Sequence, residues 1–517
     1  MKLVQISRDR IRIRTNDQEF ADVRINDLFS VSDCEANLIV SVVSLTDTDV
    51  ETSLDENDYI TPQSSIKIID CDIIGSLNNE RFVKSINKYP STNVSIKKIN
   101  KIEFSEMINS CVSKCFLLGE YSEYDCCAWV DGNNFFQRHS CVVGNTGSGK
   151  SETIAKILEE TSKLPGTNII VFDIHGEYSK FSYVRNIKIG HDKMFPIWLF
   201  GFSNMVSNIF KIKEESATVA MAALRKCYNE ICPNGNENKP IQFNFRTLLD
   251  MMQKLNKACV ATGEYYKSGD KAGMPKTTKG DFNGKLSNVI NTLETKMNDN
   301  RYSFLFQEED QGYLVELINA IMNNDKPVKN IDLSDVPHDI AIPIIGVIAK
   351  LIYDIQRDSR RMNSPITLVC DEAHVYIPNN SQLSASERRM VEIFENIAKE
   401  GRKFGVTLVV ASQRPSELNK TIMAQCANFI VSKLNNENDK SMIKGMLPDG
   451  NENVIDSTTM FSPGDVLVIG DAVPIPLKIH VDLAKERPQS RTIDFWDHWK
   501  ERKEFHVEDV IEKYISY

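Results

Sequence analysis

The sequence predicts an α/β protein in which a parallel sheet with a helical insertion follows a small β-barrel or sandwich. Up to about residue 135, short apolar runs such as Leu3 to Ile6 and Leu38 to Val43 alternate with polar clusters, as in short strands. After residue 135 the rhythm becomes strand, Gly-rich turn, helix and strand, which is the alternation that builds parallel sheets. Between about 195 and 330, long helical patterns interrupt this rhythm, and an insertion explains them better than an extra domain in series.

These observations divide the chain into three parts. The length of 517 residues agrees with this division, because about 150 residues per domain suggests roughly three units. Near the first boundary, Phe104 to Leu118 has the pattern of a single helix. We expect a small β-barrel over 1–135, an α/β core over 136–487 with its insertion at about 195–330, and a helical tail over 488–517.

Within the expected core, apolar runs of strand length alternate with amphipathic helices. The helix at Ser151 to Leu164 places Ile154, Ile157 and Leu158 on one face. A second helix, Glu387 to Lys399, separates two of the strands. The expected strands are Ser140 to Val143, Asn168 to Phe172, Ile366 to Cys370, Val406 to Ala411 and Asn428 to Leu434.

The charge of the chain is concentrated in its first quarter. The formal net charge is −10, and residues 1–135 contribute −8 of it through 14 Lys and Arg against 22 Asp and Glu. An acidic chain does not bind nucleic acid through bulk positive charge. A local basic surface on the nearly neutral remainder stays open, and the acidic part is read as a docking or gating surface for a protein partner.

The sequence shows no signal for export or membrane insertion. The N-terminus lacks a secretory apolar core, and no window reaches about 18 uninterrupted apolar residues. Most of the twelve cysteines lie in apolar runs, which suits a reducing cytoplasm. Another group, Cys111, Cys115, Cys126 and Cys127 with His139 beyond, lacks paired zinc-ligand spacing, so we predict thiols there rather than a metal site.

The strongest motif is a phosphate-binding loop between an apolar strand and an amphipathic helix. Its glycines let successive backbone N–H groups point inward at phosphate oxygens, with the helix N-terminus reinforcing the field. Lys150 is expected to reach the β and γ phosphates of ATP, and the Ser151 hydroxyl to bind Mg²⁺. The predicted nucleotide-binding residues are Gly144, Asn145, Thr146, Gly147, Ser148, Gly149, Lys150, Ser151 and Glu152.

Two carboxylates at the end of a later strand indicate hydrolysis of the nucleotide. Ile366 to Cys370 runs directly into Asp371 and Glu372, at the strand end where open α/β sheets bind ligands. Asp371 is expected to hold Mg²⁺ directly or through water, and Glu372 to act as general base on the attacking water. The alternative is an ordinary acidic helix N-terminus.

Polar residues near a third strand extend this candidate site. Gln413 follows Val406 to Ala411 and is suited to contact both the water and the γ phosphate, unless it is only a loop residue. Arg402 and Arg414 are candidates for an arginine that reaches a neighbouring subunit's nucleotide, although a helix C-terminal cation is the plainer reading of Arg402.

A further polar segment closes the second strand. Asp173, His175 and Glu177 could orient water, bind Mg²⁺ or pass movement to a substrate loop, and a structural turn at Gly176 is the alternative. These readings stay open on the sequence alone.

Taken together, the motifs resemble those of the HerA family of hexameric RecA-like ATPases, which are related to FtsK. The resemblance rests on the order of five sequence segments. It covers nearly the whole chain and is strongest between residues 136 and 480. Each segment alone is a modest match, but the five segments in this order are specific for the family. The segments are the phosphate loop, DIHGEY from Asp173, CDEAH from Cys370, EGRKFG from Glu400 and ASQRPSEL from Ala411.

The resemblance implies a HerA- and ATP-synthase-type N-terminal barrel, a RecA-like core and a homo-hexamer with ATP at its subunit interfaces. It also implies translocation along double-stranded DNA together with a separately encoded nuclease or a sirtuin-type effector, in bacterial antiphage defence or DNA end processing. Alternatives are an ATPase that scaffolds and gates an effector, and, more weakly, a conjugation or secretion motor. At one position the chain has Lys433 where an arginine is frequent, which counts against a role in trans there.

A Gly-rich stretch offers a local basic surface for DNA. Its lysines are opposed there only by Asp270 and Asp281, and a ring would repeat them around a pore. A solvated loop is the plainer reading, and Tyr265 and Tyr266 beside it are equally suited to a core. The candidate DNA-contact residues are Lys267, Lys271, Lys276, Lys279 and Lys285.

Overall fold

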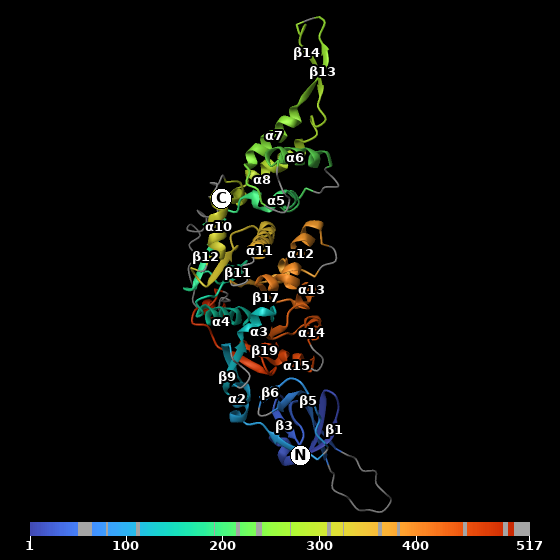
Figure 1. Cartoon of the computed structure of the whole chain (residues 1–517), viewed down its shortest axis with the longest axis vertical. Coiled ribbons are helices and arrows are strands. Elements are labelled where there is room, and N and C mark those ends of the chain that lie inside the picture. Colours follow the sequence, from blue (N-terminus) through green and yellow to red (C-terminus); the bar gives the residue numbers. More distant parts are fainter. Residues whose placement is uncertain are drawn as a thin grey trace, which may run out of the picture.

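The computed structural model places an antiparallel sheet, a large mixed sheet and an exposed hairpin one after another along the long axis (Figure 1). The N-terminal sheet lies at one end and the hairpin at the other. The structure describes residues 1–49, 65–78, 81–91, 93–109, 114–190, 192–212, 218–233, 240–268, 270–307, 312–323, 325–359, 364–379, 383–447, 452–489 and 495–500.

The central sheet confirms the predicted α/β core. Its strand order is β12-β15-β11-β16-β17-β10-β18-β19-β20-β8-β9, and neighbours from β12 to β18 pair in parallel. The carboxyl ends of the parallel strands therefore meet at one edge. The strands are β8 (Cys115–Tyr121), β9 (Cys126–Asp131), β10 (Ser140–Val143), β11 (Ile169–Asp173), β12 (Val184–Lys188), β15 (Val328–Asp332), β16 (Ile366–Cys370), β17 (Val406–Ser412), β18 (Asn428–Val431), β19 (Asp465–Gly470) and β20 (Lys478–Val481).

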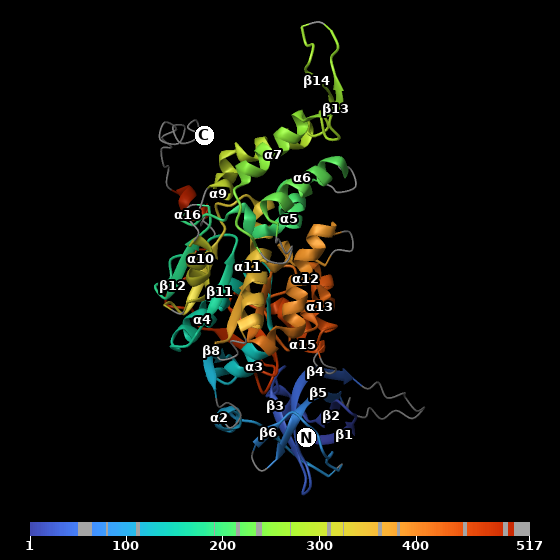
Figure 2. The same ribbon diagram turned by 45° about the horizontal axis from the view of Figure 1, so that its top comes forward.

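Helices pack against this sheet and form the main core with it. Figure 2 shows α11 and α12 side by side, and the two helices contact each other. At the start of α12, the Ser384 hydroxyl accepts from the Glu387 N–H and the Glu387 carboxylate returns a bond to Ser384, which fixes the helix N-terminus. The helices are α3 (Gly132–Gln137), α4 (Lys150–Ser162), α11 (His338–Ser359), α12 (Ala385–Glu400), α13 (Lys420–Met423), α14 (Glu437–Lys444) and α15 (Glu452–Asp456).

Between β12 and β15 the chain forms the expected helices and, in addition, a two-stranded hairpin. The longest helix, α6, is followed by α7, whose N-terminus is capped by the Asn244 side chain. The elements are α5 (Gly201–Asn204), α6 (Thr218–Ile231), α7 (Phe245–Lys257), β13 (Cys259–Tyr265), β14 (Pro275–Lys279), α8 (Ser287–Met297), α9 (Ser303–Phe306) and α10 (Tyr313–Met322).

The N-terminal unit is an antiparallel sheet in the order β1-β2-β5-β4-β3-β7, with β6 paired to β5. Its own apolar cluster includes Ile13, Val31 and Ile69. Within the described residues no pairing joins β1 to β7, so closure into a barrel stays a prediction. The elements are β1 (Lys2–Ile6), β2 (Arg10–Thr15), α1 (Asp17–Ala21), β3 (Leu28–Ser32), β4 (Asn37–Asp49), β5 (Ser65–Asn78), β6 (Arg81–Val83), β7 (Ser95–Lys98) and α2 (Lys101–Asn109).

The junction between the two sheets differs from the expected boundary. The predicted single helix at Phe104 to Leu118 is wrong, because α2 ends at Asn109 and β8 begins at Cys115. β8 pairs with β20, so β8 and β9 extend the central sheet. Consequently the sheet boundary lies between β7 and β8, upstream of residue 135.

The predicted C-terminal tail falls mostly outside the described residues. The described part of the tail includes one short helix, α16 (Phe495–Lys500), with Trp496 and Trp499 exposed. Across the parts of the chain that the structure describes, no helix is both long and apolar enough to cross a membrane.

Candidate functional site

The phosphate loop connects the carboxyl end of β10 to α4, at the edge where the parallel strands end. Gly147 and Gly149 have φ values of 75° and 99°, which favour glycine. A Cβ atom on Gly149 would lie 3.0 Å from the backbone nitrogen of Gly464. A side chain at this position is therefore excluded both by the backbone conformation and by the neighbouring turn.

Two segments that are distant in sequence support the loop. The Gly464 N–H donates to the Ser148 carbonyl at 3.1 Å, and the Asn145 N–H donates to the Lys433 carbonyl at 3.0 Å. Lys433 thus contacts the loop through its backbone. The contact between Gly464 and the phosphate loop was not predicted. The sequence feature that could have indicated it is a glycine directly before β19, in the run Gly464-Asp-Val. These contacts hold the loop's shape without a ligand.

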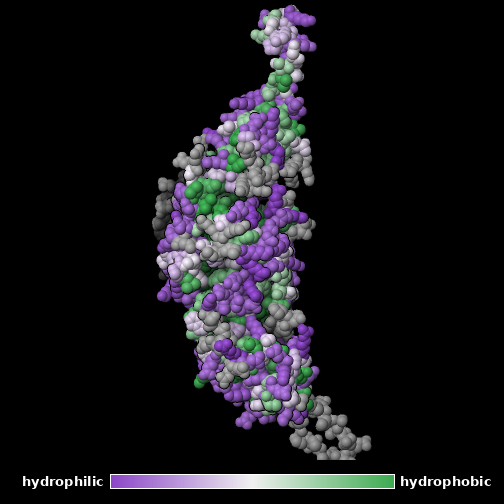
Figure 3. Space-filling model, viewed as in Figure 1, coloured by the Kyte–Doolittle hydropathy of each residue, from purple (hydrophilic) through white to green (hydrophobic). Residues whose placement is uncertain are grey.

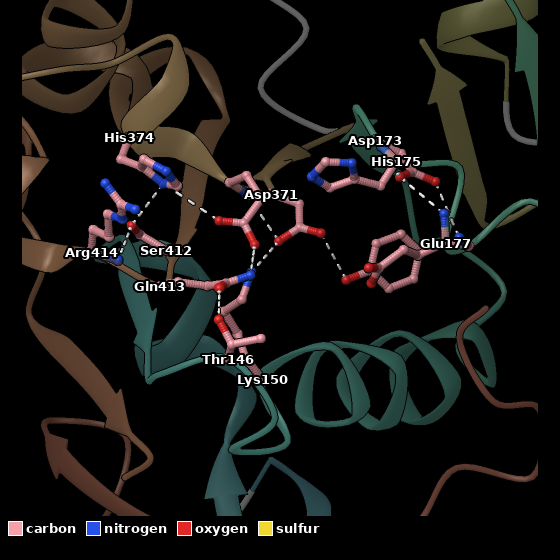
Figure 4. Close-up of polar contacts among 12 residues, drawn as sticks. Thr146, Lys150, Asp173, His175, Glu177, Asp371, His374, Ser412, Gln413 and Arg414 are labelled. Atoms are coloured by element: carbon pink, nitrogen blue, oxygen red, sulfur yellow. Dashed lines mark hydrogen bonds and ion pairs between the residues drawn. The ribbon is translucent and has the colours of Figure 1, made fainter. Parts of the chain in front are cut away.

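Lys150 is buried against the two carboxylates that end β16. Its Nζ lies 2.8 Å from Asp371 Oδ1 and 2.8 Å from Glu372 Oε1 (Figure 4). Burial alone would lower the pKa of the lysine, but the two negative charges outweigh burial and raise the pKa above its usual value. The three predicted residues therefore form one buried cluster in which a single positive charge lies between two negative charges.

Glu372 adopts an uncommon backbone conformation. Its φ and ψ of 45° and 43° are left-handed, which is unfavourable for a residue with a long side chain. Such strain concentrates at functional sites, where the surrounding structure maintains it. The Glu372 Oε2 atom is buried and has no hydrogen-bond partner among the described residues. One carboxylate oxygen is therefore available to a water molecule.

Gln413 links the carboxylate to the phosphate loop. Its Nε2 donates to Glu372 Oε1, and its Oε1 accepts from the Thr146 hydroxyl. The amide follows Ser412, the last residue of β17, and the dashed lines in Figure 4 trace this bridge. The structure thus brings Gln413 into contact with the cluster, and its contact with Thr146 was not anticipated.

His374 lies on the other side of Glu372. Its Nδ1 is 3.4 Å from Glu372 Oε2 and 3.2 Å from the Ser412 hydroxyl, which also accepts from the Arg414 N–H. Burial lowers the pKa of the imidazole below its usual value, against the opposing effect of Glu372. The ring is therefore neutral at pH 7 and restricts the orientation of the carboxylate without adding charge.

The Asp173 carboxylate fixes the loop after β11. Both of its oxygens accept hydrogen bonds there, so neither is free to face Asp371 and Glu372. Its Oδ1 accepts from the backbone N–H groups of His175, Gly176 and Glu177, and its Oδ2 accepts from Tyr178 and from the Asn330 amide. The geometry thus favours the turn reading for Asp173, whereas the His175 side chain is exposed.

Glu177 and Ser151 make an oxygen-rich corner beside Asp371. Burial and the charge of Asp371 raise the pKa of Glu177, and the nearby Ser151 hydroxyl opposes this effect only in part. Glu177 Oε2 is buried without a hydrogen-bond partner among the described residues. The Tyr178 hydroxyl donates to Asp371 Oδ2 at 3.1 Å and fixes that carboxylate.

This corner fits Mg²⁺ only together with nucleotide phosphates. No group of three or more His, Cys, Asp or Glu side chains in the described residues is arranged to bind a metal alone. Mg²⁺ in phosphoryl-transfer sites is typically held by one or two carboxylates, waters and the phosphates themselves. The Ser151 hydroxyl, Asp371 and the unpartnered Glu177 oxygen match that donor set.

The two candidate arginines lie on opposite edges of the sheet. Arg402 is exposed in the turn before β17, so it lies at the edge opposite the phosphate loop. The His139 imidazole lies near Arg402. Burial of the ring, and to a smaller extent the positive charge of Arg402, lower the pKa of His139 to about 4. Arg414 is exposed next to the cluster, and its Nη1 lies 2.9 Å from Glu417. Among the described residues, neither guanidinium forms an ion pair with Asp371 or Glu372.

The lysine-rich stretch is a hairpin, and it lies far from this cluster along the molecule (Figure 1). Tyr265 is 61% exposed and Tyr266 is 39% exposed, so the core reading of both residues is wrong. Lys285 follows the hairpin and is exposed.

A family model described as the central domain of helicase HerA matches residues 116–352. A DNA double-strand break repair helicase HerA from Saccharolobus solfataricus is 27% identical over 378 residues, covering 72% of this chain and 69% of the relative. Residues 116–352 thus match the central domain of HerA-family helicases. The counterpart from Sulfurisphaera tokodaii is 26% identical, with 72% of this chain and 70% of that protein covered.

The comparison with solved structures finds VirB4 of Thermoanaerobacter pseudethanolicus. The identity is 14%, the TM-score is 0.49, and the match covers 72% of this chain and 96% of that chain. The resemblance to the HerA family and the ATP-hydrolysing activity predicted from the motifs are confirmed by the family and sequence comparisons.

Proposed function

We propose that this HerA-like ATPase moves along double-stranded DNA as one subunit of a homo-hexameric ring. The observation that carries the proposal is the buried cluster of Lys150, Asp371, Glu372 and Gln413 at the carboxyl edge of the sheet. The relatives whose names include DNA double-strand break repair support DNA as the substrate. Movement along DNA requires that each step of ATP hydrolysis change the backbone conformation. Gln413 would provide this link, because its side chain contacts both Glu372 and the phosphate loop.

The chemistry follows from the contacts of the cluster. ATP phosphates entering the loop would compete with Asp371 and Glu372 for Lys150, because the backbone N–H groups of the loop and the N-terminus of α4 would hold the phosphates beside that lysine. Glu372 would then be free to take a proton from the attacking water. Mg²⁺, held by Ser151 and Asp371 with Glu177 nearby, would neutralise charge on the phosphates.

The contacts of Gln413 would change when the bound nucleotide is hydrolysed, and this change would affect the rest of the chain. Its amide spans Thr146 in the phosphate loop and Glu372 on the neighbouring strand end. Loss of the γ phosphate would change both partners at once and shift the segment that carries Arg414. Arg402 and Arg414 both remain candidates for completing a neighbouring subunit's site, because both side chains are exposed.

For the domain organisation, we propose a barrel-like N-terminal unit that ends between β7 and β8, an ATPase core that runs from there to residue 487 with its insertion, and a tail over 488–517. The acidic N-terminal unit would bind a separately encoded nuclease or sirtuin-type effector in defence or DNA end processing. The net charge of −8 over residues 1–135 supports a protein partner there more than DNA. The second candidate function, an ATPase that mainly scaffolds and gates the effector, rests on this same surface.

The dependence of ATP hydrolysis on DNA separates the two functions. A translocase is expected to hydrolyse ATP several-fold faster when duplex DNA is added at saturating ATP. A scaffold ATPase is expected to hydrolyse ATP at the same rate with and without duplex. The measurement is the steady-state rate of phosphate release with increasing blunt duplex, with Lys150→Ala as the background control, and an unchanged wild-type rate would overturn the translocase proposal.

A further inference from the structure

The hairpin formed by β13 and β14 projects from the insertion helices with both of its faces exposed. Every residue of β13 is exposed, and so is every residue of β14 except the half-buried Lys276. Figures 1 and 2 show the hairpin extending past α7, at the end of the molecule opposite the N-terminal sheet. Five to seven residues per strand give an arm of about 20 Å, at roughly 3.3 Å per residue.

The base of the hairpin is fixed to the neighbouring helices. Asn283 Nδ2 donates to the Ala258 carbonyl at 2.8 Å, and the Gly284 N–H donates to the Asn256 carbonyl at 3.0 Å. The Asn256 side chain in turn accepts from the Leu286 N–H at 2.9 Å, which joins the end of α7 to the start of α8. The arm is therefore held in direction by the insertion, although its strands have no cover.

An uncovered hairpin needs a partner. A two-stranded ribbon on its own is at best marginally stable in water, because it buries little apolar surface. Val260 is 56% exposed and Met274 is 56% exposed, so the hairpin has no core of its own. The observations therefore indicate a surface that is covered in the working assembly.

The charges of the arm identify the kind of partner. Of the lysines on the arm, Lys276 pairs with Glu264 at 3.1 Å and lies over the Tyr266 ring. By contrast, Lys267, Lys271 and Lys279 are exposed and form no ion pair with any carboxylate of the described residues. Figure 3 shows mainly hydrophilic side chains at the tip of the arm. Unpaired lysines on a projecting arm are complementary to a polyanion.

We propose that this hairpin is a duplex-binding arm that contacts the phosphate backbone of double-stranded DNA. The inference rests on the proposed function, since it assumes that duplex DNA is the substrate. A two-stranded ribbon fits the B-DNA major groove, which is about 12 Å wide. The unpaired lysines suit phosphate contact without reading bases, as a motor that moves along any sequence requires.

The test replaces the three unpaired lysines by alanine in the full-length chain. The variant is Lys267→Ala with Lys271→Ala and Lys279→Ala, and the readout is the affinity for a labelled 30-base-pair duplex over a salt series. Each lost phosphate contact reduces the log–log salt slope by about 0.9, so we expect the slope to decrease by about 3 and low-salt affinity to fall at least about tenfold.

A matched control removes three lysines that are already paired within the chain. In the variant Lys163→Ala, Lys350→Ala and Lys399→Ala, the lost partners are Glu160, Asp354 and Glu395. This control should keep the wild-type salt slope. The ATPase rate without DNA should be unchanged in both triple variants, because none of these lysines lies in the cluster around Lys150.

Three results would overturn the inference. If the arm variant keeps the wild-type salt slope while duplex still stimulates ATP hydrolysis, DNA binds elsewhere and only the arm is wrong. If the arm variant instead loses oligomer mass in light scattering, the arm contacts a second copy of the chain. If wild-type protein neither binds duplex nor responds to it, the proposed function fails first.

Discussion

Replacing Glu372 with glutamine is expected to stop ATP turnover while ATP binding remains. The amide keeps the size of the side chain but cannot accept a proton from water. General base catalysis typically contributes about 10²- to 10⁴-fold, so kcat should fall by at least about 100-fold. The measurement is phosphate release at saturating ATP, together with equilibrium binding of a fluorescent ATP analogue.

The left-handed backbone at Glu372 makes glutamine the appropriate replacement. Both side chains have the same branching, so the strain at φ 45° is unchanged and folding should be preserved. A matched control is Glu437→Gln, since Glu437 is exposed at the start of α14 and its ion-pair partner in the described part of the chain is Lys440. Near-normal hydrolysis by the Glu372 variant would show that another group is the base.

Replacing Lys150 with alanine is expected to abolish both ATP binding and hydrolysis. The variant loses a cation that bonds phosphates, and a hydrogen bond to a charged group is worth about 1.5–3 kcal/mol, or about 10- to 100-fold in affinity. It also leaves Asp371 and Glu372 buried without a counter-charge. Breaking a buried ion pair on one side typically costs about 3–5 kcal/mol of stability.

These two effects predict a destabilised apo protein that ATP no longer stabilises. Thermal unfolding with and without ATP measures both, because ligand binding to the native state raises the melting temperature. Lys156→Ala is a useful comparison on the same helix, since Lys156 pairs with Glu160 away from the carboxylate cluster. A Lys150 variant that still gains stability from ATP would contradict the assignment.

The phosphate loop and the carboxylate pair were predictable because each is determined locally. The loop requires glycines at defined positions, and Asp371 and Glu372 directly follow a strand of five buried residues. Gln413 was predictable for a similar reason, since it directly follows a strand of seven buried, mostly apolar residues. In such segments the pattern of a few neighbouring residues decides the structure.

Other features depend on contacts between distant segments. β15 was not predicted because its sequence VKNID is polar, yet Lys329 bonds Asn168 and Asn330 bonds Asp173 within the sheet. The pairing of β8 with β20 joins residues more than 300 positions apart and moved the boundary between the sheets. The hairpin reads as a Gly-rich loop, because its strands lack buried residues and therefore lack alternation.

Displacement of a third strand from duplex DNA tests most directly whether ATP hydrolysis at this cluster drives movement along the duplex. A third strand bound to one end of a long duplex is displaced only by a motor that travels along the duplex. We predict displacement by the wild-type chain with ATP, and none by Glu372→Gln or with a non-hydrolysable analogue. Rapid ATP hydrolysis by wild-type protein on this substrate, without release of the third strand, would contradict the account.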